Sequence, residues 1–200
     1  MMTDREVVFT AKDFEIQKEE THYQGYVSLK SLQVRHKLYQ GGWSETLRRE
    51  LVQRSAAAAV LLYDPDRDEV VLIEQFRVGA LSDPSGPWML ELVAGVVEPG
   101  ECFEALVTRE AQEEAGLEVF DLKKICEYYP SPGASDEKLV LFCGHVDSSG
   151  AGGIHGLAEE GEDICVKVYP RKKTVELMKQ GYVNNAATII ALQWLELTVG

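Results

Sequence analysis

The sequence predicts a mixed α/β fold, an α/β/α sandwich around a mixed β-sheet, preceded by an N-terminal antiparallel β-segment. Short apolar runs typical of strands alternate with segments of helical spacing, in the order β, α, β, α. The 200 residues are 45% hydrophobic, which is enough for one packed core of medium size. The first 54 residues carry strand patterns and no helix pattern. We therefore expect a strand-rich segment over 1–54 and a catalytic domain over 55–200.

The N-terminal segment is expected to contain short strands. The alternation of apolar and polar residues predicts them at 6–10, 21–29 and 31–39, with a turn at 40–42. Three strands alone make a poor core, so this sheet is expected to pack on its own catalytic domain or on a partner subunit. Residues 44–54, which carry three arginines, are expected to connect the two parts.

The catalytic domain is expected to begin with a hairpin of two strands, at 56–63 and 69–76, joined by the aspartate-rich turn 64–68. Apolar runs predict further strands at 88–97, 118–129, 138–146 and 164–169, and helical spacing predicts helices at 171–180 and 186–196. The glycine-rich stretch 147–161 has no apolar periodicity. Such a long loop inside a compact domain is more often functional than idle.

The stretch 95–117 carries the chemistry. Its spacing predicts a helix that Gly116 ends. Glu110, Glu113 and Glu114 share one face of that helix, where like charges repel by roughly a few tenths of a kcal/mol per pair. A hard divalent cation would turn this repulsion into attraction, because magnesium prefers carboxylate oxygens. Arg109, four residues before Glu113, can hold one carboxylate in place.

The same stretch resembles the Nudix box. The matching positions are Gly95, Glu101, Arg109, Glu110, Glu113, Glu114, Gly116 and Leu117, while Ala111 stands where a larger aliphatic residue is usual. The resemblance implies a hydrolase that cleaves a nucleoside diphosphate linked to another group and that uses magnesium.

The chain is also similar, over nearly its whole length, to the ADP-ribose pyrophosphatase subfamily of Nudix proteins. Pro132, sixteen residues after Gly116, marks that subfamily, and the stretches 74–77, 131–133, 153–158 and 184–187 resemble it too. This implies hydrolysis of ADP-ribose to AMP and ribose 5-phosphate with Mg²⁺, for which Mn²⁺ can substitute. It also implies a homodimer with exchanged N-terminal segments.

The resemblance implies a role for each matching residue. The metal would be held by the backbone carbonyl of Ala94 and by Glu110, Glu113 and Glu114, with Glu101 supporting them and Arg109 orienting them. The catalytic base aligns best with Glu160, and Glu162 is the second choice. The substrate-binding residues would be Tyr26 on the adenine, Arg49 and Glu50 on the adenosine end, Arg77 on the phosphates, and Glu137. Relatives often carry Phe at the position of Tyr26.

Composition excludes several partners. The net charge of −13 argues against a nucleic-acid backbone. No apolar run approaches the roughly 20 residues that span a bilayer. The four cysteines are widely spaced, which is typical of reduced thiols. The first residues lack the basic and apolar regions of a signal peptide, so we expect a cytoplasmic protein. The four histidines fit no nucleophile or metal arrangement and are expected to be structural or exposed.

Two alternatives stay open at this stage. The same chemistry could act on another nucleoside diphosphate sugar, such as ADP-glucose or GDP-mannose. A non-catalytic nucleotide-sugar-binding regulator on the same fold is the other alternative. The complete set of Arg109, Glu110, Glu113 and Glu114 argues against the second, because loss of catalysis would normally show in the metal-binding residues.

Overall fold

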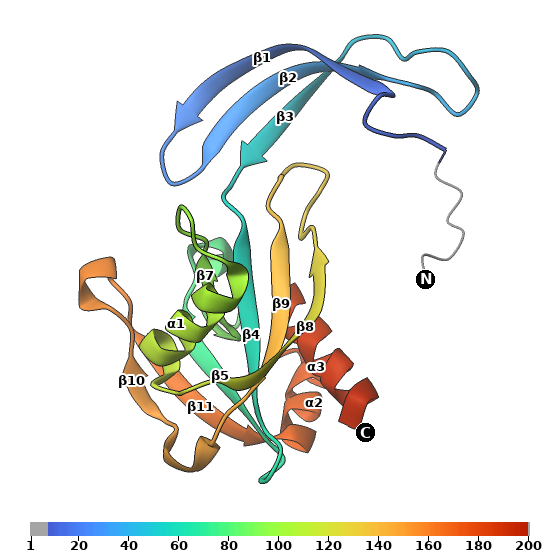
Figure 1. Ribbon diagram of the computed structural model, residues 1–200. Helices are drawn as coiled ribbons and strands as arrows, with labels where there is room; N and C mark the ends of the chain where they lie inside the picture. The colour runs from blue at the N-terminus through green and yellow to red at the C-terminus, as the bar shows by residue number, and fades with distance from the viewer. Residues whose placement is uncertain (1–7, 200) are drawn as a thin grey trace. The chain divides into compact units, whose positions relative to one another are not determined.

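The computed structural model describes residues 8–199, apart from the side chain of Glu160, and it divides into two compact units (Figure 1). The first unit holds the described residues up to Arg54 together with residues 131–137. The second unit holds residues 55–130 and the chain from Lys138 onward. The loop 131–137 therefore packs with the first unit, although the sequence places it inside the predicted catalytic domain.

The first unit is a three-stranded antiparallel sheet in the order β1 (Phe14–Gln24), β2 (Ser28–His36) and β3 (Leu47–Gln53). Every residue of β1 is exposed, so the sheet has little core within this unit. Ion pairs join β1 to β2 across the strands, from Lys30 to Glu19 at 2.6 Å and from Arg35 to Glu15 at 2.7 Å. Such exposed pairs each contribute only about 0.2–1 kcal/mol.

Three expectations for this segment need correction. The strand predicted over 21–29 is interrupted by the β1–β2 turn at 25–27, because the alternation of side chains continues across that turn and hides it. Residues 44–54 are not only a connection, since they contain β3, whose three consecutive charged residues obscure its pattern. Residues 8–10 of the strand predicted at 6–10 are not in a strand, and its first two residues lie outside the described ones. The turn predicted at 40–42 is confirmed.

The second unit is built on a mixed sheet with the strand order β10-β11-β5-β4-β9-β8, in which β6 also pairs with β5 and β7 with β4. Strands β4 and β9 are parallel, and the other neighbours are antiparallel. The strands are β4 (Ala57–Asp64), β5 (Glu69–Phe76), β6 (Trp88–Glu91), β7 (Val93–Val96), β8 (Phe120–Tyr128), β9 (Leu139–His145), β10 (Gly153–His155) and β11 (Ile164–Pro170).

Most strand predictions for this unit are confirmed, because buried strands read as uninterrupted apolar runs. The strand predicted over 88–97 is divided at Leu92 into β6 and β7. This division carries the chain from its pairing with β5 to its pairing with β4. The stretch predicted as a loop over 147–161 contains β10 and two short 3₁₀ turns.

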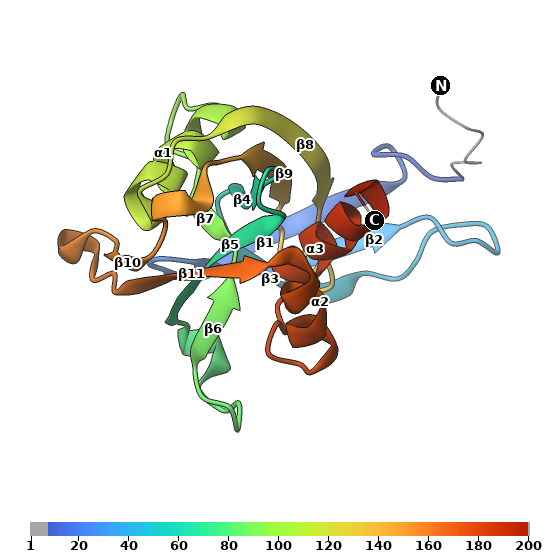
Figure 2. The same cartoon turned by 90° about the horizontal axis from the view of Figure 1, so that it is seen from below.

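Helices cover both faces of this sheet (Figure 2). Helix α1 (Phe103–Ala115) lies on one face, and α2 (Arg171–Lys179) and α3 (Ala186–Val199) lie on the other. One buried cluster joins Leu106 and Val107 of α1 to alternate residues of β4 and β5. A second cluster joins Leu192 and Leu195 of α3 to the opposite face of the same strands. The predicted α/β/α sandwich around a mixed sheet is thus confirmed.

Candidate active site

Helix α1 sets the geometry of the candidate site. Its buried residues Leu106, Val107 and Ala111 face the sheet, and this rotation brings the neighbouring face of the helix toward β7. The helix ends at Gly116, whose φ of 66° lies in the left-handed region that favours glycine. Its last turn therefore closes without strain, immediately after Glu113 and Glu114.

Strand β7 and helix α1 approach each other closely through Gly95. A Cβ atom at this position would overlap the carboxylate of Glu110. The next residue back, Ala94, donates its backbone N–H to Glu114 Oε2 at 3.1 Å. The absence of a side chain at Gly95 is what lets the Glu110 carboxylate lie against the strand.

Arg109 gathers the acidic side chains around one guanidinium group. Its Nε lies 3.2 Å from Glu101 Oε1, and its Nη1 lies 2.9 Å from Glu113 Oε2 and 3.0 Å from Glu110 Oε1. The Arg109 side chain is 34% exposed, whereas those of Glu101 and Glu110 are 15% and 13% exposed. These contacts raise the pKa of Arg109 and lower that of Glu101, so both stay charged.

Glu110 and Glu114 are in a different electrostatic state. Burial raises the pKa of Glu110 to about 7, which the contact with Arg109 opposes and repulsion from Glu113 and Glu162 reinforces. Burial raises the pKa of Glu114 to about 8, against the hydrogen bond from Ala94 N–H. Glu114 is only 2% exposed. The surroundings of both carboxylates therefore destabilise their ionised forms.

The predicted base residues lie in the loop between β10 and β11. Glu162 Oε2 accepts the backbone N–H of Leu157 at 3.0 Å, and its charge raises the pKa of both Glu110 and Glu114. Glu162 therefore lies close to the carboxylates of α1. The backbone of Glu160 belongs to the short turn Ala158–Glu160, while its side chain lies outside the described part of the structure.

The donor set of this site suits a hard divalent cation. It is composed of carboxylate oxygens, and two of the groups are buried beside each other with raised pKa values, so a bound cation would relieve their repulsion. Among the described residues, no three His, Cys, Asp or Glu side chains converge closely enough to hold a metal ion. Glu110 and Glu114 are less exposed than Glu113, whose side chain is 31% exposed, so they form the nucleus of the proposed metal site.

Arg77 lies next to this cluster at the end of β5. Its Nε contacts Glu91 Oε2 at 2.7 Å, and its positive charge lowers the pKa of Glu114. The Arg77 side chain is 44% exposed, so part of the guanidinium is open to solvent.

The first unit carries the other predicted substrate residues. Tyr26, at the β1–β2 turn, is 83% exposed. The guanidinium of Arg54 lies 5.6 Å from the centre of its ring, and Arg54 Nη1 lies 3.2 Å from Glu137 Oε1. Arg49 and Glu50 are exposed on β3. Sequence reasoning missed Arg54, because it treated this stretch as a connection, although its three arginines were the signal.

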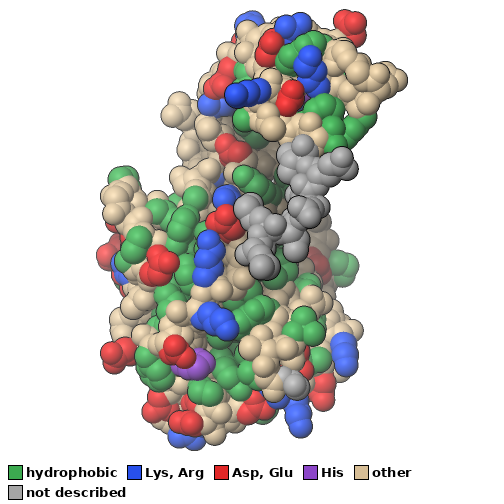
Figure 3. All heavy atoms as spheres, turned by 45° about the vertical axis from the view of Figure 1, so that its right-hand side comes forward, with side chains coloured by type: hydrophobic (Ala, Val, Ile, Leu, Met, Phe, Trp, Pro, Cys, Tyr) green, Lys and Arg blue, Asp and Glu red, His purple; other side chains and the backbone are tan. Residues whose placement is uncertain are grey.

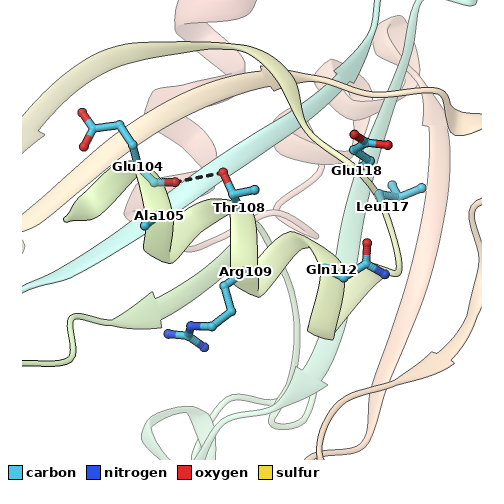
Figure 4. Close-up of a pocket in the computed structure, with 7 residues that line it drawn as sticks. All are labelled: Glu104, Ala105, Thr108, Arg109, Gln112, Leu117 and Glu118. Carbon is cyan, nitrogen blue, oxygen red and sulfur yellow. Dashed lines mark hydrogen bonds between the residues drawn. The ribbon is translucent and has the colours of Figure 1, made fainter. Parts of the chain in front are cut away.

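A hollow of about 700 Å³ runs along the outer side of α1 (Figure 4). Of the acidic cluster and its arginine, Arg109 alone lines it. Figure 4 shows the Arg109 side chain extending away from Thr108, whose hydroxyl donates to the Glu104 carbonyl at 2.9 Å. The hollow is thus distinct from the carboxylate cluster, and it offers no second set of convergent functional groups.

Charges of both signs are interspersed over the surface in Figure 3, where basic, acidic and hydrophobic side chains alternate. The net charge of −13 is therefore not gathered on this face. Local positive charge near the carboxylate cluster comes instead from individual residues such as Arg77 and Arg109.

Comparison with known proteins shows the family. The NUDIX domain model matches residues 52–192. The chain is 47% identical over 192 residues to an ADP-ribose pyrophosphatase of Haemophilus influenzae, covering 94% of this chain and 88% of that protein. It is also 47% identical to the ADP-ribose pyrophosphatase of Escherichia coli strain K12, covering 96% of this chain and 91% of the other. This chain belongs to the Nudix family, which confirms the resemblance seen in residues 95–117.

Two further relatives are more distant. A GDP-mannose pyrophosphatase of Cronobacter sakazakii is 36% identical over 152 residues, covering 75% of this chain and 78% of that protein. A solved structure described as an ADP compounds hydrolase superposes with a TM-score of 0.69 at 18% identity, over 96% of this chain and 98% of that one. The second likeness supports the fold alone. None of the helices described between residues 8 and 199 is long and apolar enough to cross a membrane.

The raised pKa values of Glu110 and Glu114 predict how stability depends on pH without metal. Both pKa values lie above the unfolded value near 4.5, so the folded chain binds more protons, and its stability falls as the pH rises from about 4.5 to about 8. At about 1.4 kcal/mol per pKa unit, the two raised pKa values together correspond to a loss on the order of several kcal/mol over this window. Urea unfolding of metal-free protein at pH 5.5 and pH 8 measures it.

Adding 10 mM Mg²⁺ is expected to restore stability more at pH 8 than at pH 5.5, because the cation competes with protons. The variant Glu114→Gln is the matched control and should lose most of this pH dependence. Equal stability of the wild-type protein at both pH values, with no effect of Mg²⁺ at either, would contradict the electrostatic account of the site.

Proposed function

We propose that this protein hydrolyses the pyrophosphate bond of ADP-ribose to give AMP and ribose 5-phosphate, with Mg²⁺ as cofactor and Mn²⁺ as a possible substitute. The observation that carries the proposal is the pair of the partly buried Glu110 and the fully buried Glu114, held beside Arg109 against β7. The two relatives that are 47% identical over most of the chain support ADP-ribose as the substrate.

The residues fit the requirements of this reaction. A pyrophosphate bond is kinetically inert because its anionic oxygens repel an attacking water. A bound divalent cation supplies charge neutralisation and activation of water. In this chain Glu110, Glu113 and Glu114, with the Ala94 carbonyl, would hold the cation. Arg109 and Glu101 would keep these carboxylates in place, through the ion pairs that Arg109 already makes.

The proton of the attacking water needs an acceptor outside the metal-binding group. We assign this role to Glu160 and keep Glu162 as the second choice. Both lie in the turn between β10 and β11, and Glu162 lies close to Glu110 and Glu114. A loop of this kind can close on substrate and exclude bulk water.

The substrate-binding roles follow the chemistry of each side chain. Arg77, partly exposed beside the carboxylates, would bind phosphate oxygens with its planar guanidinium. Tyr26 would stack on the adenine, and its exposed ring already lies beside Arg54. Arg49 and Glu50 would contact the adenosine end. Glu137, which is tied to Arg54, would support this group.

A second candidate substrate is supported by the 36% identical relative, which is named a GDP-mannose pyrophosphatase. ADP-glucose remains a further candidate on the same chemistry. A non-catalytic nucleotide-sugar-binding regulator is disfavoured, because the carboxylates and Arg109 are all present and already arranged around one another. Four free cysteines fit a reduced cytoplasmic location, which we also propose.

A hydrolysis panel tests the substrate. ADP-ribose, ADP-glucose and GDP-mannose are incubated with enzyme and Mg²⁺, and the nucleoside monophosphate released is measured. We expect the highest kcat/KM for ADP-ribose and a loss of at least about 100-fold in Glu114→Gln, because that change removes a ligand charge. Faster turnover of GDP-mannose would overturn the substrate assignment. No turnover of any of these substrates at any Mg²⁺ concentration would favour the non-catalytic nucleotide-sugar-binding regulator.

The variant Gly95→Ala tests the close approach of β7 and α1. The added Cβ overlaps the end of the Glu110 side chain, which can swing aside, so the fold should survive while the carboxylate is displaced. We expect a thermal midpoint within a few degrees of wild type and a drop in kcat/KM of roughly 10-fold or more. Gly150→Ala, where nothing lies within 4 Å of the added Cβ, is the matched control. Unchanged activity in Gly95→Ala would show that the Glu110 position is unimportant.

We also propose that the protein is a homodimer that exchanges its N-terminal segments. The exposed β1 supports this, because a sheet of three strands needs an apolar partner surface. Sedimentation equilibrium should give twice the mass of 22.3 kDa. Deletion of residues 1–54 should give a monomer without activity. A wild-type monomer with full activity at assay concentration would exclude this arrangement.

A further inference from the structure

His155 lies between the C-terminal end of helix α1 and the loop that carries Glu160 and Glu162. It is the last residue of β10 and pairs with Ile164 of β11. Its ring packs on Gly116, at the end of α1, where a Cβ atom would lie 2.8 Å from His155 Cε1. His155 Nε2 donates to the Gly152 carbonyl at 2.9 Å, which fixes the orientation of the ring. The histidine therefore occupies space that is open only because residue 116 is a glycine.

The chain that follows His155 is folded tightly back on Glu162. Gly156 has a φ of 98°, and a Cβ atom there would lie 2.7 Å from the Cβ of Glu162. The next N–H, of Leu157, donates to Glu162 Oε2 at 3.0 Å. An uninterrupted series of contacts thus runs from Gly116 through His155 and Gly156 to Glu162.

We propose that His155 is a positioning residue, which seats the acidic loop 156–162 on the C-terminal end of α1 and so holds Glu162 beside Glu110 and Glu114. The inference rests on the proposed hydrolysis, because in that reaction a loop glutamate must be held close to the reacting water. It also gives Gly116 a second role besides ending the helix, namely leaving room for the imidazole ring. His155 itself touches no reacting atom in this account.

Replacement of His155 should loosen the loop and leave the rest of the fold intact. In His155→Ala we expect kcat to fall by roughly 10-fold or more while KM for ADP-ribose changes less than about threefold, since the substrate-binding residues are elsewhere. His155→Phe keeps the ring that packs on Gly116 and should recover a substantial part of kcat. His145→Ala, in a half-buried histidine of β9 that pairs with Asp121, is the matched control and should retain wild-type kinetics.

A double-mutant cycle separates positioning from a general structural role. If His155 acts through the loop glutamates, adding His155→Ala to a variant that carries both Glu160→Gln and Glu162→Gln should lower kcat by less than about threefold further, because the groups to be positioned are already lost. The proposal would be overturned if the fold-decreases in kcat of the separate variants simply multiply when combined, or if His155→Ala has wild-type kcat.

A readout that needs no catalysis keeps this proposal distinct from the proposed function. His155→Ala should speed cleavage of the full-length protein by a glutamate-specific protease within 156–162 by about 10-fold or more, since a loosened loop is cut more readily. His145→Ala should not. If wild-type protein fails to hydrolyse ADP-ribose but His155→Ala still speeds proteolysis, the proposed function is wrong while the positioning role of His155 is supported. If His155→Ala changes neither the rate of proteolysis nor kcat, His155 does not position the loop.

Discussion

The burial of two mutually repelling carboxylates against one strand is the constraint on which the rest of this structure depends. Desolvation raises the pKa values of Glu110 and Glu114 to about 7 and about 8, and nearby carboxylates add to this: Glu113 and Glu162 for Glu110, and Glu110 and Glu162 for Glu114. Such an arrangement costs stability in the absence of a counter-charge. We propose that the same property that makes the pair unfavourable alone would make it a strong ligand for a divalent cation.

The fold supplies each support that this pair needs. The apolar residues of α1 fix the rotation of the helix, and Gly95 lets the strand come close enough for Glu110 to lie against it. Ala94 supplies a backbone N–H to Glu114, and Arg109 binds Glu101 and Glu113 at the open side. Gly116 ends the helix and leaves space for His155. The glycines of this motif therefore act through the contacts that a side chain would prevent.

The sequence predicted the main architecture because its signals are local. Helical spacing and a terminal glycine defined α1, and apolar runs defined β4, β5 and β9. The prediction was wrong where local pattern and tertiary structure disagree. Strand β3 carries charges on three consecutive residues, and the turn at Tyr26 continues an alternating pattern. The contacts of Arg54 and His155 join residues far apart along the chain, so no spacing rule could identify them.

The most direct test of the central claim is a crystal structure with Mn²⁺ and a non-hydrolysable ADP-ribose analogue, with anomalous scattering to locate the metal. We expect an anomalous peak within coordination distance, about 2.0–2.3 Å, of oxygens of both Glu110 and Glu114, with the analogue's diphosphate beside it. An anomalous peak bound elsewhere, with Glu110 and Glu114 making no contact to metal or diphosphate, would contradict it.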